Sequence, residues 1–388
     1  MALRRRRLAS RRKSTGHTQE SLAEKLNVDR TTVVRWERAE SEPQPWVRPG
    51  LANALQVTLE ELTQLLDDVE EANTRQGDRL AYVLKNPRTA DLATVAYLRH
   101  ELDALTETYD TTPSTSLLPT VGRLHGEIAL LHSSASIGGV RQALATLHAA
   151  SATLMGQLVW DASQRRDRRT AIRYYEQAVA VARQSNEILH EAHARLRTGF
   201  VALYADRDPK RGLSQAAHAA HLAADFGSGA LAGLAMLHVA EAYAMVGERS
   251  ACHHALGQAG DRIDSVDTTD PAHRLVTAGQ FDRVVGSCYL ALGDPRKAQP
   301  VLEATSSVLR TREKSRSIVL GNLALAHIRQ RHVAEATAVL HEAIDVVERT
   351  RAGGGLNVLF RASRELHRWR NRHEVYQVTD RILSLIAR

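Results

Sequence analysis

The sequence predicts an all-α protein, and composition and residue spacing are the observations behind that prediction. Aromatic residues make up 4% of the 388 residues and prolines number ten, whereas β-sandwiches and barrels draw on aromatic and β-branched residues. Ala, Leu, Arg and Glu recur with apolar residues three and four apart, the spacing of amphipathic helices. A chain of this length can bury at least two cores, and its 43% hydrophobic content argues against wholesale disorder.

Positive charge is concentrated at the N-terminal end. Residues 1–50 hold 12 Lys or Arg against 6 Asp or Glu, whereas the net charge of the whole chain is +7. A local excess of this kind in a helical segment is typical of phosphate contacts with nucleic acid. The candidate phosphate contacts in the basic run are Arg4, Arg5, Arg6 and Arg7. A solvated basic tail is the alternative that charge alone leaves open.

Two short helices joined by a tight turn follow this run. Thr18 can cap a helix over 19–26, and Asn27 tolerates the left-handed conformation that ends a helix. Asp29 can then cap a second helix over 30–38.

The two faces of the second helix differ in chemistry. Val33 and Trp36 share a stripe that we expect to face inward. The opposite face offers guanidinium groups and a hydroxyl, from Arg30, Thr31, Val34 and Arg35.

This segment resembles a known DNA-binding family. From Gly16 the chain reads GHTQESLAEKLNVDRTTVVRWERAE, which is similar to the Xre/Cro-type helix-turn-helix of bacterial and phage repressors over about residues 3–66. In that family the second helix enters the major groove. The resemblance therefore implies base-edge contacts by Arg30, Thr31 and Arg35, and the two arginines favour guanine.

The resemblance implies two further roles. Gln19 corresponds to a phosphate contact, and Arg12 corresponds to the partner of Glu37 in an internal ion pair. Asn27 stands where the family usually has Gly, a change that the turn tolerates.

The rest of this domain is expected to hold two more helices. Three prolines punctuate a loop before a helix over 47–55, and Trp46 in that loop is expected to anchor the core. Thr58 and Glu61 form a capping box for a last helix over 59–66. We thus predict a five-helix DNA-binding domain over 1–66. An acidic boundary and helical linker should follow over 67–120, with a turn near Gly77, a helix over 92–109 and a loop over 110–116.

Residues 121–388 are predicted to form a second domain of repeats. Five segments fit a helix–turn–helix template whose Ala-like positions are 171, 213, 252, 298 and 336, at separations of 42, 39, 46 and 38 residues. They resemble degenerate tetratricopeptide repeats, although the strict repeat has ~34 residues. The best match contains Gly286, Tyr289, Gly293, Asp294 and Ala298. A generic Ala-rich helical bundle remains the alternative because the period drifts.

Stacked helix pairs make a right-handed solenoid with a concave inner face. If the first helix of each pair lines that face, the inward positions form a candidate ligand groove: Trp160, Gln164, Arg195, Thr198, Glu241, Met245, Gln280, Arg283, Ser287 and Arg329.

The order of the two domains resembles the RRNPP group of peptide-responsive regulators. That resemblance implies a homodimeric transcriptional regulator of double-stranded operator DNA, controlled by a small molecule or peptide bound in the tetratricopeptide-like domain. One alternative is a tetratricopeptide-type scaffold or enzyme inhibitor with an accessory DNA-binding domain. Another is a metal- or nucleotide-dependent enzyme with a DNA-binding extension.

Catalytic, metal and cofactor sites have no positive support in the sequence. The histidine pairs 190/193 and 218/221 share helix faces, but their spacing fixes no third or fourth ligand. The run 353–355 of three glycines lacks the flanking Lys-Ser or Lys-Thr of a phosphate loop, so we expect a turn between helices there. We predict no catalytic residue, no metal and no cofactor.

A cytoplasmic location is expected. Cys252 and Cys288 are too few for a disulfide framework, and no apolar segment follows the basic run as in a signal peptide. The most apolar window, 229–246, contains His238 and Glu241 and is expected to be a buried helix and not a membrane span.

Overall fold

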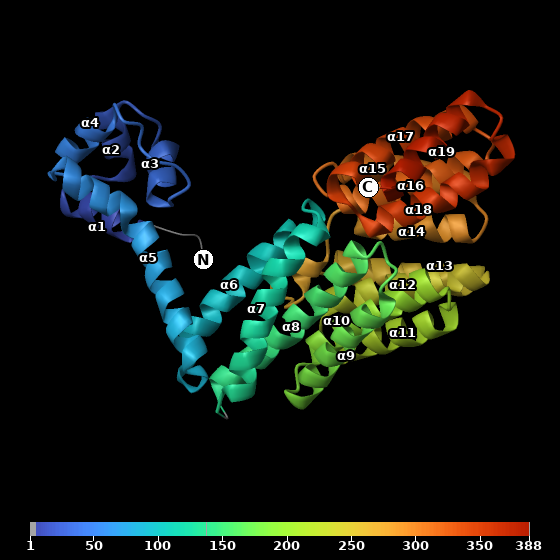
Figure 1. Ribbon diagram of the computed structural model, residues 1–388, viewed down its shortest axis with the longest axis horizontal. Coiled ribbons are helices and arrows are strands. Elements are labelled where there is room, and N and C mark those ends of the chain that lie inside the picture. Colours follow the sequence, from blue (N-terminus) through green and yellow to red (C-terminus); the bar gives the residue numbers. More distant parts are fainter. Residues whose placement is uncertain (1–4, 137, 388) are drawn as a thin grey trace. The chain divides into compact units, whose positions relative to one another are not determined.

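The computed structural model describes residues 5–136 and 138–387, without the side chains at 6, 67–78, 386 and 387. Every regular element within these ranges is helical, which confirms the predicted all-α class. The chain divides into two compact units, Met1–His100 and Glu101–Arg388, and each is considered by itself (Figure 1). The division falls inside 67–120, the segment predicted as a linker.

The first unit packs its N-terminal helices around one apolar core, drawn in blue in Figure 1. Its elements are α1 (Arg6–Ser14), α2 (Gln19–Leu26), α3 (Arg30–Glu37), α4 (Arg48–Ala54) and α5 (Leu59–Lys85), followed by η1 (Pro87–Thr89) and α6 (Leu92–Glu107), which runs into the second unit. Val33 and Trp36 are buried in the core, as the stripe on α3 predicts. Other core members are Leu8, Leu22, Leu51, Leu55, Leu62 and Leu66.

Capping and turn chemistry fix the ends of these helices. The Thr18 hydroxyl accepts a hydrogen bond from the Ser21 N–H at 3.0 Å, so α2 begins where predicted. Asn27 ends α2 with φ 51°, the left-handed conformation that the turn requires. Thr58 and Glu61 form the reciprocal capping box of α5. Asp29 precedes α3 in an extended conformation but makes no side-chain cap.

Helix α5 is longer than predicted. It was expected to end at Leu66, and it continues without a break to Lys85. The acidic residues of 67–71 lie on this helix, with side chains outside the described set, and Gly77 lies inside it. Acidic residues that lie one turn before basic ones on a helix form favourable side-chain pairs. One glycine lowers the stability of a helix by only about 1 kcal/mol. A single Gly therefore did not mark a turn.

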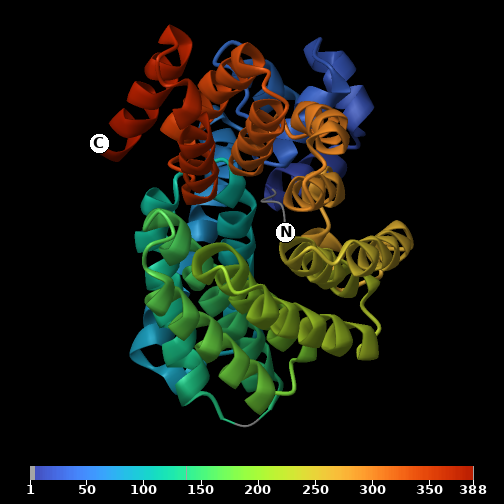
Figure 2. The ribbon, with the colours of Figure 1, turned by 90° about the vertical axis from the view of Figure 1, so that its right-hand side faces the viewer.

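The second unit is an array of antiparallel helix pairs. Its elements are η2 (Thr108–Asp110), α7 (Ser114–Ser134), α8 (Gly139–Ala162), α9 (Arg168–Gln184), α10 (Ile188–Val201), the π-helical turn η3 (Ala202–Asp206), α11 (Pro209–Asp225), α12 (Gly229–Val246), α13 (Arg249–Asp264), η4 (His273–Leu275), α14 (Gln280–Ala291), α15 (Pro295–Val308), α16 (Glu313–Arg329), α17 (Val333–Thr350), α18 (Gly353–Leu366), η5 (His367–Trp369) and α19 (His373–Ala387). Figure 2 shows the pairs following a curved path from the green helices to the red ones.

The five template segments correspond to successive helix pairs, α8/α9 through α16/α17. The Ala-like positions Ala171, Cys252, Ala298 and Ala336 are fully buried at the crossings. Close approach demands small residues, since a Cβ on Gly286 would lie 2.5 Å from Leu302 Cδ2. A further pair, α18/α19, follows the five and was not predicted.

The three glycines at 353–355 form the first turn of α18. The prediction that they make a turn between helices is therefore wrong. They are needed because α18 begins against other helices. A Cβ on Gly355 would lie 2.1 Å from Ser317 Oγ of α16, and one on Gly353 would lie 2.6 Å from the Asp161 carbonyl oxygen of α8. Loop 110–116 is likewise shorter than predicted, because α7 begins at Ser114.

Helix α12 is the one described helix long and apolar enough to cross a membrane. Within the unit, however, 72% of that window is buried, as in the core helix of a folded domain. Its contacts with α11 and α13 agree with the buried helix that the sequence predicts.

Candidate nucleic-acid interface and ligand pocket

The outward face of α3 presents the residues predicted to read bases. Arg30, Thr31 and Arg35 are exposed, whereas Val33 and Trp36 of the same helix are buried. The helix thus offers two guanidinium groups and one hydroxyl to solvent from a rigid, packed base. Guanidinium groups in this position match the acceptors of guanine in a major groove.

Arg30 has an acidic neighbour on α2. Its Nε lies 2.6 Å from Glu20 Oε1, and both side chains are more than half exposed. A hydrogen bond from the Glu20 backbone is the largest influence that lowers the pKa of Glu20, and the Arg30 charge adds to it. The carboxylate is therefore ionised at neutral pH and forms an exposed ion pair with Arg30.

Beneath this face lies a buried polar network. Arg12 Nε donates to Glu37 Oε1 at 2.6 Å, which is the pair that the family resemblance implies. The Gln19 amide nitrogen donates to Glu37 Oε2 at 2.6 Å. The Gln19 amide is thus engaged within the fold, and its role as a phosphate contact stays a prediction.

The structure corrects one prediction for the basic run 4–7. Arg5 was predicted to contact phosphate, but it is 4% exposed. Its guanidinium donates to the Leu66 carbonyl at 2.7 Å and to the Ser41 carbonyl at 2.9 Å. It joins main-chain carbonyl groups of α5 and of the loop after α3 within the fold, so its role is structural. Arg7 is exposed, whereas Arg4 and the side chain of Arg6 lie outside the described residues.

Trp46 was predicted to anchor the core and is instead 77% exposed. The chain turns at 44–47, where the Val47 N–H donates to the Gln44 carbonyl at 2.9 Å. This turn directs the indole outward, and Pro43 of the same loop is buried in its place.

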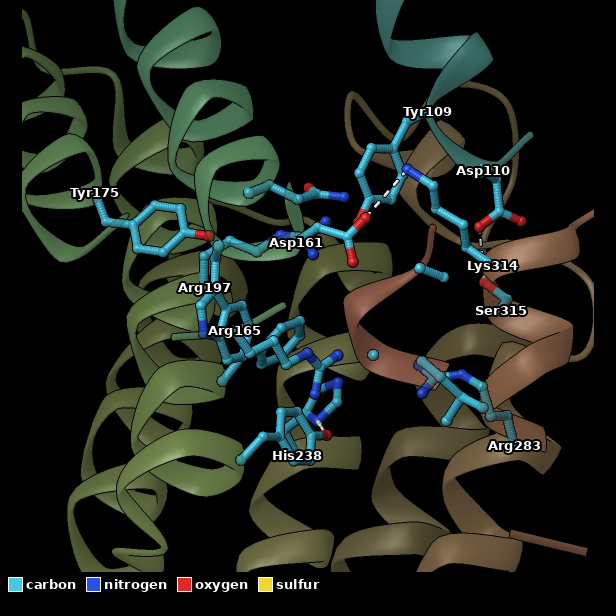
Figure 3. Close-up of a pocket in the computed structure, with 17 residues that line it drawn as sticks. Tyr109, Asp110, Asp161, Arg165, Tyr175, Arg197, His238, Arg283, Lys314 and Ser315 are labelled. Carbon is cyan, nitrogen blue, oxygen red and sulfur yellow. Dashed lines mark hydrogen bonds and ion pairs between the residues drawn. The ribbon is translucent and has the colours of Figure 1, made fainter. Parts of the chain in front are cut away.

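The second unit contains a pocket of about 130 Å³ (Figure 3). Its wall comes from η2, from α8 and the turn after it, and from α9, α10, η3, α12, α14, α16 and the start of α18. The residues that line it are Tyr109, Asp110, Gln157, Trp160, Asp161, Arg165, Tyr175, Arg197, Phe200, Tyr204, His238, Arg283, Lys314, Ser315, Ile318, Ala352 and Gly354.

One wall of the pocket is backed by an ionised carboxylate. The Tyr204 hydroxyl donates to Glu241 Oε2, the Ser287 hydroxyl donates to Oε1 at 2.8 Å, and His238 Nδ1 lies 3.1 Å from Oε2. Burial works to raise the pKa of Glu241, but these hydrogen bonds outweigh it and hold the pKa at about 2. Burial lowers the pKa of His238.

A second carboxylate, Asp161, joins distant parts of the array beside the pocket. Its Oδ2 accepts from the Ser114 hydroxyl at 2.7 Å and lies 3.2 Å from Lys314 Nζ, and its Oδ1 accepts from the Gly353 N–H at 2.8 Å. The start of α7, the end of α8 and the starts of α16 and α18 therefore meet at one side chain.

Only some of the residues predicted to form the ligand groove lie at this pocket. Trp160 and Arg283 line the pocket, and Glu241 and Ser287 bond to each other behind its wall. The other candidates do not line it: Arg195 pairs with Glu191, Thr198 bonds to the Ala194 carbonyl, Gln280 bonds to Thr277, Arg329 pairs with Glu365, Gln164 lies in a left-handed turn, and Met245 is half-buried.

Sequence reasoning missed most pocket residues. Tyr109, Lys314 and Gly354 lie outside or at the edges of the five template segments, so repeat spacing could not nominate them. Arg165 follows α8 in a turn, with φ 63°. The π-helical turn at 202–206 changes the direction of side chains after α10. The triple glycine at 353–355 was the one available signal of close approach.

No group of three or more His, Cys, Asp or Glu is arranged to hold a metal ion in the part of the chain that the structure describes. Cys252 and Cys288 are both buried and unbridged.

Comparison with known proteins identifies parts of both units. Residues 8–62 match the helix-turn-helix family and residues 319–351 match a tetratricopeptide repeat. No curated protein matches the chain. Among solved structures it is similar to one described as Bacillus thuringiensis PlcR in complex with the peptide PapR7 and DNA, at 16% identity and a TM-score of 0.34, over 71% of this chain and all of that one.

The chain therefore joins an Xre-type helix-turn-helix domain to a tetratricopeptide-like array, which is the make-up of a DNA-binding transcription regulator. The predicted family resemblance is confirmed at this level.

Proposed function

We propose that this protein is a sequence-specific, homodimeric regulator of transcription that acts in the cytoplasm and is controlled by an effector bound in its second unit. The observation that carries the proposal is the outward face of α3, where Arg30, Thr31 and Arg35 are exposed on a helix fixed by a buried core. In a helix-turn-helix domain this is the helix that reads the major groove.

Each base contact in the proposal has a defined chemistry. A guanidinium donates two parallel hydrogen bonds to O6 and N7 of guanine, and such a contact contributes roughly 1–3 kcal/mol of discrimination. In a dimer, two copies of α3 read half-sites ~34 Å apart on one face of the duplex. The operator should then be a pseudo-palindrome that contains guanine in each half.

The effector acts through a difference in affinity. It shifts the dimer between DNA-competent and incompetent states only by the ratio of its affinities for those states. The pocket in the second unit, lined by aromatic and charged side chains, supports a site for such an effector.

Operator selection from random DNA with the full chain tests this proposal. The expected result is an enriched motif with two related half-sites, bound by a dimer in sedimentation analysis. Arg35→Ala should reduce the preference for one base in each half-site by about 10- to 100-fold. Arg88→Ala, an exposed arginine outside the helices around the core, is the matched control and should keep the motif.

Circular dichroism of both variants excludes unfolding as the cause. Selection that enriches no motif would overturn the proposal and favour a protein-interaction scaffold. An Arg35→Ala variant with unaltered base preference would remove α3 from the reading role.

A further inference from the structure

Three arginines on the pocket wall lack the acidic partner that a guanidinium in a folded protein usually has. Arg165 follows α8, Arg197 lies on α10 and Arg283 lies on α14, and all three are half-buried. Among the residues that the structure describes, none of the three forms an ion pair with a carboxylate within 4.0 Å. Figure 3 shows Arg165 and Arg283 approaching from opposite sides of the pocket.

The nearby carboxylates already have other partners. Asp161 is engaged by Lys314, Ser114 and the Gly353 N–H. Asp110 lies 3.3 Å from Arg312 and accepts from the Ser315 hydroxyl at 3.1 Å. Glu241, behind the wall, is engaged by Tyr204 and Ser287. The four cationic side chains of the lining, Arg165, Arg197, Arg283 and Lys314, therefore outnumber the carboxylates of Asp110, Asp161 and Glu241 by one.

Arg165 is held by aromatic rings in place of an anion. Its guanidinium carbon lies 4.5 Å from the centre of the Trp160 ring and 5.5 Å from that of Tyr204. Burial is the largest influence and lowers the pKa of Arg165; the charge of Asp161 opposes it, and the charge of Arg283 lowers the pKa further. A desolvated guanidinium without an anion is costly, and an arriving carboxylate or phosphate would remove that cost through charge-assisted hydrogen bonds.

Two other polar atoms of the pocket lining are buried without a hydrogen-bond partner. They are Trp160 Nε1, in a side chain that is 6% exposed, and His238 Nε2, in one that is 1% exposed. The indole N–H can only donate, so it requires an acceptor. The neutral His238 ring, whose Nδ1 faces Glu241, has an Nε2 that can accept.

The start of α18 adds to the positive field. Gly354 lies in its first turn and lines the pocket, so the positive end of the helix faces this space. A Cβ at this position would lie 2.5 Å from Arg165 Nη2. Glycine there allows the guanidinium to rest against the helix end.

We propose that this pocket binds a small organic anion, whose carboxylate or phosphate group is held by Arg165 and Arg283 with the Trp160 N–H as a further donor. The inference rests on the proposed function and names the chemical class of its effector. A dry apolar cavity of ~150 Å³ accommodates benzene, so a pocket of about 130 Å³ takes a body of roughly one ring. Trp160, Phe200 and Tyr204 supply the apolar surface for that body.

Calorimetric titration of the full chain with benzoate, phenyl phosphate and neutral benzamide tests the proposal. At least one of the two anions should bind, and benzamide should bind about tenfold more weakly or not at all, since it lacks the charge. The two anions distinguish a carboxylate from a phosphate as the natural group.

Arg165→Gln and Arg283→Gln should each weaken binding of the preferred anion by about tenfold or more. Arg262→Gln is the matched control, because Arg262 is a half-buried arginine of the same unit that does not line the pocket. If Arg165→Gln loses its helical circular dichroism, Arg283→Gln carries the test.

The proposal is overturned if neither anion binds at about 10 mM, a concentration that would reveal even weak ligands. It is also overturned if benzamide equals the better anion, or if both pocket variants bind as the unaltered chain does. Operator selection fails or succeeds independently of these titrations. Anion binding without an enriched DNA motif would contradict the proposed function alone, and a motif without anion binding would contradict this inference alone.

Discussion

The buried arginines of the first unit and the half-buried arginines of the second unit's pocket have different surroundings. In the first unit, Arg5 donates to main-chain carbonyl groups and Arg12 is paired with Glu37, so both guanidinium groups are satisfied within the fold. In the second unit, Arg165 and Arg283 share a pocket, and among the described residues neither forms an ion pair with a carboxylate within 4.0 Å.

This difference separates structural arginines from candidate binding residues. A buried charge with its partners in place holds helices together, and removing one partner leaves the other exposed to the full cost of desolvation. A half-buried charge without an anionic partner costs the free protein desolvation free energy, which a bound anion can offset.

The largest effect is expected for Arg12→Ala. This change leaves the Glu37 carboxylate buried with only the Gln19 amide beside it, and breaking a buried pair in this way costs about 3–5 kcal/mol. Hydrogen exchange of α2 and α3 should become faster by a corresponding factor. Lys13→Ala, an exposed neighbour on α1, should leave the exchange unchanged; equal exchange in both variants would show that the ion pair is dispensable.

A smaller effect of the opposite sign is expected for Arg165→Met. Replacing an unpaired, desolvated guanidinium with an apolar chain of similar length should leave the stability of the second unit unchanged or raise it by up to about 1 kcal/mol. Thermal unfolding in anion-free buffer measures this. A variant clearly less stable than the unaltered chain would mean that Arg165 has a structural role like that of Arg12.

The smallest effect is expected on the α3 face itself. Glu20→Gln removes the ion pair that holds Arg30, and exposed pairs contribute only about 0–1 kcal/mol. DNA affinity should rise by up to about fivefold as one negative charge is lost and Arg30 is released. Fluorescence anisotropy across a salt series measures it. Glu24→Gln on the same helix loses the same charge without freeing Arg30, so an equal gain in both variants would attribute the change to charge alone.

The first unit was largely predictable because its signals are local. The caps at Thr18 and Thr58, the left-handed Asn27 and the inward stripe of α3 each follow from residues a few positions apart. Charge counting was less informative. It could not distinguish Arg5, which satisfies carbonyl groups of the core, from an arginine that faces DNA, because that depends on contacts 31 to 61 residues away.

The pocket was not predictable in the same way. Repeat spacing located the helix pairs, since small residues recur wherever helices cross. The pocket instead brings Tyr109 and Lys314 together, more than two hundred positions apart and both outside the template, as their 4.1 Å ring contact shows. A π-helical turn, a left-handed Arg165 and the extra pair α18/α19 alter which side chains face inward.

The position of Asp161 has a consequence for how order spreads through the array. In an open solenoid each repeat is coupled only to its neighbours, so disorder at one terminus stays there. Here a single carboxylate joins α8 to α18, with an N–H donor 192 positions away along the chain. Loosening of the last helices therefore affects the first repeat directly. The array should unfold cooperatively, and not lose one helix pair at a time from its end.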